Sequence, residues 1–226
     1  MSKDNLSLSR RRFMEASAAG AAAAATVGSA EAAHGGSTLR VRNYSDIQVL
    51  DPGYILSAPE TDVNQCLLLG LVSTQPGDDW AWAPEAAAEI DQVDDTHINF
   101  TLRDDIGWTN GFGAITAEDV KYSYERVADP AMESPYAEDW VALQTVEVHD
   151  ERSGTIVLNE AYAPLWTTTM PSGRGMIVCK EAVESLDGKR YEAAPPAVAG
   201  PYDIADWSPS QKLTLQAIDG YTGPTA

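Results

Sequence analysis

The chain has 226 residues and a formal charge of −19, because 15 Lys and Arg residues face 34 Asp and Glu residues. A composition of 44% hydrophobic and 22% charged residues is that of an ordinary globular protein and excludes the low-complexity, collagen-like and disulfide-scaffold classes. The acidic excess also argues against nucleic-acid binding, since the sequence has no basic patch that could neutralise phosphates.

The first 32 residues have the pattern of an export signal. Residues 9–14 form a twin-arginine run, a small and weakly apolar stretch follows at 16–30, and Ala30-Glu31-Ala32 gives an A-x-A cleavage pattern. The stretch is too short and too rich in alanine for a membrane anchor. We predict cleavage after Ala32 and export by the twin-arginine translocase. The mature chain then has 11 basic and 31 acidic residues, a balance typical of salt-adapted proteins.

The hydrophobic periodicity of the mature chain predicts short strands alternating with helices. Thr116 and Asp119 form an approximate capping box for the clearest helix, and Gly70 is the expected stop of an earlier one. In chain order, the predicted elements are a strand at 38–43, a helix at 60–69, a strand at 97–102, a helix from Thr116 to Asp129, strands at 145–148 and 155–158, a helix at 180–186, and strands at 202–207 and 212–217.

The sequence contains no recognisable catalytic constellation. It has no nucleophile elbow and no phosphate-binding loop, and its three histidines are too far apart to suggest a metal site. We therefore predict neither a cofactor nor a metal. Cys66 and Cys179 lie in apolar stretches, as two free thiols or one disulfide.

Pairs of neighbouring carboxylates leave one enzymatic alternative open, an exported acidic hydrolase that uses such a pair. General acid–base chemistry needs two carboxylates whose pKa values are pushed apart. These pairs lie in loops of an acidic chain, where solvation is the stronger explanation. They are Asp78-Asp79, Asp94-Asp95, Asp104-Asp105 and Glu138-Asp139.

Several short motifs follow one another in a fixed order. They are Leu50-Asp51-Pro52, Trp82-Ala83-Pro84, Phe100-Thr101-Leu102-Arg103, Trp108-Thr109-Asn110-Gly111, Thr116-Ala117-Glu118-Asp119-Val120, Ser134-Pro135-Tyr136 and Gly200-Pro201-Tyr202. Over almost all of residues 38–221, this order resembles the extracellular solute-binding proteins of family 5, the oligopeptide- and dipeptide-binding components of ATP-driven importers. Asn110 stands where members commonly carry Asp, a change that keeps the turn chemistry.

The resemblance implies an α/β fold, a lobe of the periplasmic-binding-protein type II kind with a small inserted α/β subdomain. After the signal at 1–32, lobe I would comprise residues 33–68 and 159–203, the inserted subdomain residues 69–158, and the start of lobe II residues 204–226. Members are usually more than twice as long, so we expect a C-terminally truncated chain that lacks most of the second lobe. Because these receptors close two lobes over the solute, one lobe alone should bind weakly.

The resemblance also implies a function without catalysis. The protein would be a monomeric receptor, in the periplasm or at the outer face of the cytoplasmic membrane, that binds a peptide and delivers it to a membrane ABC permease. In this family the peptide lies extended and pairs through its main chain. Leu56, Ser57 and Ala58 would border the ligand, and Tyr136 and Tyr202 would supply aromatic walls.

Overall fold

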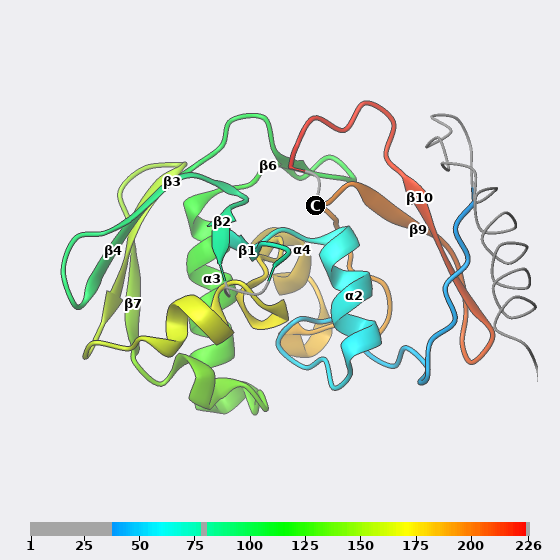
Figure 1. Cartoon of the computed structure of the whole chain (residues 1–226), viewed down its shortest axis with the longest axis horizontal. Coiled ribbons are helices and arrows are strands. Elements are labelled where there is room, and N and C mark those ends of the chain that lie inside the picture. The colour runs from blue at the N-terminus through cyan, green and yellow to red at the C-terminus, as the bar shows by residue number, and fades with distance from the viewer. Residues whose placement is uncertain (1–37, 78–80, 225–226) are drawn as a thin grey trace, which may run out of the picture. The chain divides into compact units, whose positions relative to one another are not determined.

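The computed structural model describes residues 38–77 and 81–224, so the predicted signal and Asp78-Asp79 lie outside the described residues (Figure 1). The chain divides into two units, residues 1–42 and 43–226. Residues 38–43 include the boundary between the two units. They pair with none of the described strands, so the strand predicted there is wrong. Leu39 and Val41 are 87% and 74% exposed. Alternation alone does not make a strand, because a strand also needs a neighbouring edge that takes up its backbone hydrogen bonds.

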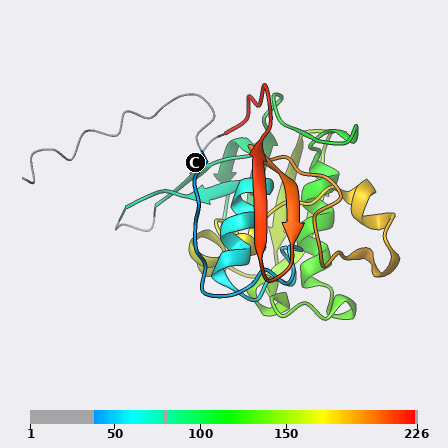
Figure 2. The ribbon, with the colours of Figure 1, turned by 90° about the vertical axis from the view of Figure 1, so that its right-hand side faces the viewer.

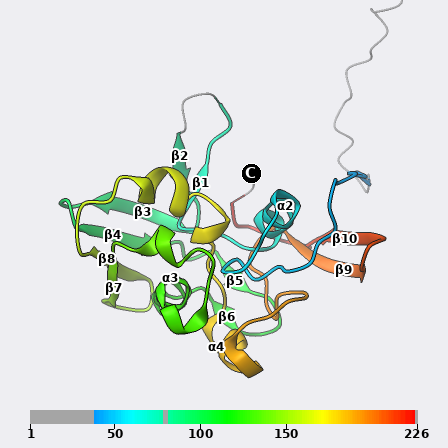
Figure 3. The same ribbon diagram turned by 90° about the horizontal axis from the view of Figure 1, so that it is seen from below.

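A four-stranded antiparallel sheet is the largest sheet of the second unit, with the order β3–β4–β8–β7 (Figure 3). Its strands are β3 (Ala87–Gln92), β4 (His97–Leu102), β7 (Leu143–Val148) and β8 (Ser153–Leu158). The predictions of β4, β7 and β8 are confirmed. Strand β3 escaped prediction because a register shift between Ala87 and Glu89 breaks its two-residue period.

Helix α3 (Ala117–Ala128) packs against this sheet, as Figures 1 and 3 show. Its capping box is present: Thr116 N donates to Asp119 Oδ2 at 2.9 Å, and Asp119 N donates to Thr116 Oγ1 at 3.3 Å. The apolar residues Val120, Tyr124 and Val127 form a buried stripe along the helix, and the ring of Tyr124 stacks on Trp140 with 4.2 Å between centroids. The helix therefore joins the sheet to the core.

Helix α2 (Ala58–Leu67) begins and ends earlier than predicted. Ser57 is its N-cap, and the proline that follows Ala58 suits the first turn of a helix. The helix ends because Leu68 takes an extended backbone, with φ −126° and ψ 161°, before Gly70 is reached. The N-terminal difference brings Glu60 into the first turn, where it has a structural role described below.

Three two-stranded sheets and several short helices complete the described fold. The paired strands are β1 (Val72–Thr74) with β2 (Trp82–Pro84), β5 (Gly107–Trp108) with β6 (Gly113–Ala114), and β9 (Tyr202–Ser208) with β10 (Lys212–Ala217). The helical turns are η2 (Pro130–Met132), η3 (Ala137–Trp140), η4 (Leu165–Thr169), η5 (Gly173–Gly175), α4 (Lys180–Glu184) and η6 (Asp187–Lys189). The late hairpin and α4 are confirmed predictions. Figure 2 shows the hairpin (orange to red) beside α2 (cyan).

Both cysteines are free thiols, which settles the alternative that the sequence left open. Cys66 is half-buried and Cys179 buried, and burial raises the pKa of both thiols, that of Cys179 to about 11. Within residues 38–77 and 81–224, no helix has the length and apolarity that crossing a membrane requires. The sheet and α3 fall inside the predicted subdomain range 69–158, whose boundaries stay a prediction.

Glu85 lies where the chain leaves β2 and runs beside residues 70–71. Its own N–H donates to Leu71 O at 2.9 Å, and its Oε2 accepts from Gly70 N at 2.7 Å. Burial raises the pKa of the Glu85 carboxyl to about 7, in spite of the Gly70 bond. The charged form of the Glu85 carboxyl therefore destabilises the folded state.

We predict that Glu85→Gln stabilises the protein above pH 7 and leaves it unchanged below pH 4.5. The native carboxyl has a pKa of about 7 against an ordinary 4.5, so the unfolded state loses its proton first, and wild-type stability falls as pH rises between these values. The gain at pH 8 is on the order of 2–3 kcal/mol. Urea unfolding at pH 4, 6 and 8 measures it, with exposed Glu89→Gln as the control. An equal effect of Glu85→Gln at pH 4 and pH 8 contradicts the assignment.

Candidate functional site

The 48–57 segment, residues 48–57, leads into α2 and contains the start of the predicted ligand border. Glu60, 1% exposed, lies beneath it. The Glu60 carboxylate accepts four hydrogen bonds from backbone N–H groups, at 2.7–3.1 Å. Oε1 accepts from Gln48 and Val49, and Oε2 accepts from Leu56 and Ser57. One buried side chain thus ties together the two ends of the segment.

The four donors keep the Glu60 carboxylate charged. Burial raises the pKa of the group, but the backbone N–H bonds outweigh burial and lower the pKa below its ordinary value. A carboxylate that accepts several backbone N–H bonds satisfies donors that the segment would otherwise bury without partners.

A second buried carboxylate, Asp51, holds the middle of the segment. It forms a two-pronged ion pair with Arg126 of α3, with nitrogen–oxygen distances of 2.7 and 2.8 Å and side chains 0% and 4% exposed. Asp51 also accepts from Gly53 N at 3.0 Å. Burial lowers the pKa of the Arg126 guanidinium, and the bonds to Asp51 more than compensate, so its pKa is raised overall. The pair fixes the segment to α3.

Three hydrogen bonds from side-chain hydroxyls to backbone carbonyls hold the rest of the segment. Tyr54 Oη donates to Met132 O at 2.6 Å, and Ser134 Oγ donates to Gly53 O at 2.7 Å. Tyr136 Oη donates to the Ile55 carbonyl. The chain between α3 and β7 therefore forms one wall of a clamp on the segment, and α2 forms the other.

The structure brings four of the five predicted ligand residues together. Leu56 is 72% exposed, Ser57 caps α2, and Ala58 begins it. Tyr136 is half-buried and bonds to the residue before Leu56. In the described part of the chain, no hydrogen bond uses the carbonyl oxygen of Leu56. The site thus presents an exposed residue whose main chain is held by its N–H and whose carbonyl oxygen is free of described hydrogen bonds.

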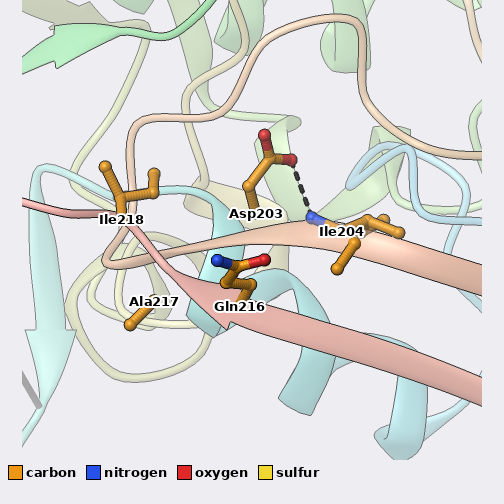
Figure 4. Close-up of a pocket in the computed structure, with 6 residues that line it drawn as sticks. Asp203, Ile204, Gln216, Ala217 and Ile218 are labelled. Atoms are coloured by element: carbon orange, nitrogen blue, oxygen red, sulfur yellow. Dashed lines mark hydrogen bonds between the residues drawn. The ribbon is translucent and has the colours of Figure 1, made fainter.

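Tyr202 lies apart from these four residues. It begins β9, is 39% exposed and pairs with Ala217. Among the described side chains, no hydrogen bond or ring contact links it to Tyr136. Figure 4 shows the neighbouring pocket of about 240 Å³, in which the Asp203 carboxylate accepts from Ile204 N at 2.7 Å. The residues that line this pocket are Asp203, Ile204, Ala205, Gln216, Ala217 and Ile218.

A second pocket, of about 100 Å³, lies beside the 48–57 segment. It is lined by Ile55, Thr61, Tyr136, Ser172, Gly173 and Arg174. The Arg174 guanidinium lies over the ring of Tyr136, 4.6 Å from its centroid, and its Nε is 3.0 Å from Asp139 Oδ2. We call this cavity the Tyr136 pocket.

Sequence reasoning missed the groups that hold the site in place. One local signal was available: Ser57-Ala58-Pro59-Glu60 fits the S-x-x-E signature of a helix start. The contribution of Arg126 had no such signal, because its partner Asp51 is 75 residues away.

The described carboxylate pairs make surface ion pairs. Asp94 accepts from Thr96 and His97, and these bonds lower its pKa to about 2, the opposite of what a general acid needs. Asp105 bonds to Arg103 at 2.6 Å, and Asp104 lies 3.7 Å from Arg152. Among the residues that the structure describes, no cluster of three or more His, Cys, Asp or Glu side chains could hold a metal.

We predict that Asp51→Asn lowers the free energy of unfolding by about 3–5 kcal/mol, because it leaves the Arg126 charge buried without its partner. Urea unfolding at pH 7 measures the loss. Adding Arg126→Met should recover part of it, since the unpaired charge is then gone. The exposed pair supplies the control, as Asp105→Asn should cost at most about 1 kcal/mol. Equal losses for Asp51→Asn and Asp105→Asn would contradict the role of the buried pair.

Comparison with known proteins gives relatives along most of the chain. This chain is 29% identical over 222 residues to the periplasmic oligopeptide-binding protein OppA of Salmonella typhimurium. The match covers 90% of this chain and 40% of OppA. Over 93 residues it is 36% identical to the periplasmic murein peptide-binding protein MppA of Escherichia coli, covering 41% of this chain and 16% of MppA. The chain therefore spans about 40% or less of the length of these relatives.

Solved structures show the same fold. The binding protein MoaA of A. tumefaciens R10, in complex with mannopinic acid, matches with a TM-score of 0.70 and 26% identity, over 78% of this chain and 36% of MoaA. Escherichia coli MppA matches with a TM-score of 0.65 and 24% identity, over 76% of this chain and 36% of MppA. The predicted α/β fold of a periplasmic-binding-protein lobe is confirmed.

Residues 81–226 match the family described as "Bacterial extracellular solute-binding proteins, family 5 Middle". This match covers more than half of the chain and includes six of the seven motifs that first suggested the resemblance. The relatives are binding proteins, so membership does not support the acidic hydrolase. The chain belongs to the family 5 bacterial extracellular solute-binding proteins.

Proposed function

We propose that this chain carries a peptide-binding lobe, in which the main chain of Leu56–Ala58 borders an extended peptide. The observation that supports this most is the fixed main chain of the exposed residue Leu56. Buried carboxylates hold its N–H and fix the segment before it, while its carbonyl oxygen is left for a partner. The names of OppA and MppA indicate peptide ligands for those two relatives.

Main-chain recognition suits such a site. An extended peptide that adds to an exposed backbone edge gains affinity from its own N–H and C=O groups, whatever its side chains. Because the segment is already held in place, little conformational entropy is lost when the peptide binds. Tyr136 and Tyr202 are proposed as flanking aromatic walls, Tyr136 next to Leu56 and Tyr202 at the start of β9.

The wider context is part of the same proposal. The protein is exported to the periplasm or the outer face of the cytoplasmic membrane by the twin-arginine route, acts as a monomer, and passes its solute to a membrane ABC permease. The periplasmic relatives support export. The acidic composition supports a salt-adapted surface.

Titration of the isotope-labelled chain with tetra-alanine, followed by NMR, tests the proposal and detects weak binding. We expect saturable shifts of the amide signals of Leu56, Ser57 and Ala58. The matched control peptide is tetra-alanine with its internal amides N-methylated, which has the same side chains but fewer main-chain donors. It should bind at least about tenfold more weakly, since several hydrogen bonds are lost.

Equal affinity for the two peptides would contradict main-chain recognition. Saturable shifts that spare residues 56–58 would move the ligand to another surface. No saturable shift with tetra-alanine would contradict a peptide-binding lobe in this chain.

A further inference from the structure

We propose that the Tyr136 pocket is a side-chain subsite that selects an uncharged carboxamide, as in the side chain of asparagine, over an isosteric apolar or anionic group. The inference rests on the proposed function and adds selectivity to it. Two observations support the inference: the hydrogen bonds that the polar groups lining the pocket already make, and the size of the pocket.

Two hydroxyl groups at the pocket have already committed their hydrogens to the protein. Tyr136 Oη donates to Ile55 O, and Ser172 Oγ donates to Thr169 O at 2.9 Å. Ser172 Oγ also accepts from Arg174 N at 3.3 Å, which takes up one of its two lone pairs. Each oxygen can therefore only accept a further hydrogen bond. A third hydroxyl, that of Thr61, makes a longer bond of 3.4 Å to Ser57 O. The pocket thus offers acceptor oxygens that an N–H group can satisfy.

Arg174 supplies the complementary donor. Its Nη1 donates to Thr168 O at 3.3 Å. Its Nε lies 3.0 Å from Asp139 Oδ2 without forming a hydrogen bond, and in the described part of the chain its Nη2 donates to no group either. Because Asp139 already balances the guanidinium charge, the pocket is not an anion site. Instead, a hydrogen-bond donor and several acceptors lie close together in the pocket.

A carboxamide matches this combination. Its NH₂ group can donate to the Tyr136 and Ser172 oxygens, and its C=O can accept from Arg174 Nη2. A carboxylate has no hydrogens for the two acceptors, and a leucine side chain satisfies neither kind of group. The volume of about 100 Å³ is well below the 300–1,000 Å³ of a whole-ligand pocket, which suits one small side chain.

A peptide series tests the subsite. Asn, Leu or Asp, three side chains of similar shape, replaces each alanine of tetra-alanine in turn, and the tightest peptide of each set is compared by NMR titration of the labelled chain. The tightest peptide of each set is the one whose substituted residue reaches the pocket. The comparison therefore does not depend on the register in which the peptide binds. We expect the Asn peptide to bind about three- to tenfold more tightly than the Leu or Asp peptide, with a shift of the Gly173 amide signal.

Two variants separate chemistry from size. Ser172→Ala removes one acceptor and should bring the Asn-to-Leu ratio towards one. Ser185→Ala is its matched control, because Ser185 Oγ also donates to the carbonyl three residues earlier, at 2.7 Å, on α4. Gly173→Ala places a Cβ 2.6 Å from Ile55 Cδ1, narrows the pocket, and should weaken the Asn, Leu and Asp peptides while sparing tetra-alanine.

The outcomes distinguish the two proposals. If tetra-alanine binds at residues 56–58 but the Asn, Leu and Asp peptides bind equally, the subsite is wrong and the peptide-binding lobe stands. If the Asp peptide binds most tightly, Arg174 makes an anion site and the carboxamide assignment is overturned. If tetra-alanine itself fails to bind, both the peptide-binding lobe and the subsite are contradicted. Because the wild-type ratio decides the matter, a variant that does not fold leaves the test intact.

Discussion

The arrangement of the candidate site depends on one buried carboxylate accepting four backbone hydrogen bonds. Glu60 binds N–H groups at both ends of the 48–57 segment, at distances of 2.7–3.1 Å. Without it, the buried N–H of Val49 would remain unpaired, at a cost of about 1–3 kcal/mol, and the other three donors would turn to water. Because Glu60 also stands in the first turn of α2, the shape of the segment and the start of the helix are fixed by the same side chain.

The rest of the site follows from this constraint. Asp51 joins the middle of the segment to Arg126 of α3, and Tyr136 holds the carbonyl of Ile55. The segment therefore cannot move independently of α2, α3 or the chain that leads into β7. With the main chain fixed, the exposure of Leu56 is a property of the fold, and Tyr136 can serve the segment and the neighbouring pocket at once.

The parts of this fold that the sequence predicts are those set by local patterns. The capping box at Thr116 and the alternation at His97–Leu102 are confirmed because neighbouring residues determine them. The strand expected at 38–43 failed because alternation carries no information about a pairing edge. The site is harder, because its bonds are long-range: Tyr136 reaches a carbonyl 81 residues away, so the resemblance placed the ligand border at Leu56–Ala58 but not the groups that hold it.

Amide hydrogen exchange of Glu60→Gln tests the central claim most directly. Gln offers one acceptor oxygen and a donating NH₂ group where the carboxylate offers two acceptors, so two of the four N–H groups lose their partner. The account predicts at least about tenfold faster exchange within the group Gln48, Val49, Leu56 and Ser57, relative to the amides of α3 in the same sample. Glu118→Gln, at an exposed carboxylate in the first turn of α3, should leave these four rates unchanged. Wild-type exchange rates at all four positions in Glu60→Gln would contradict the account.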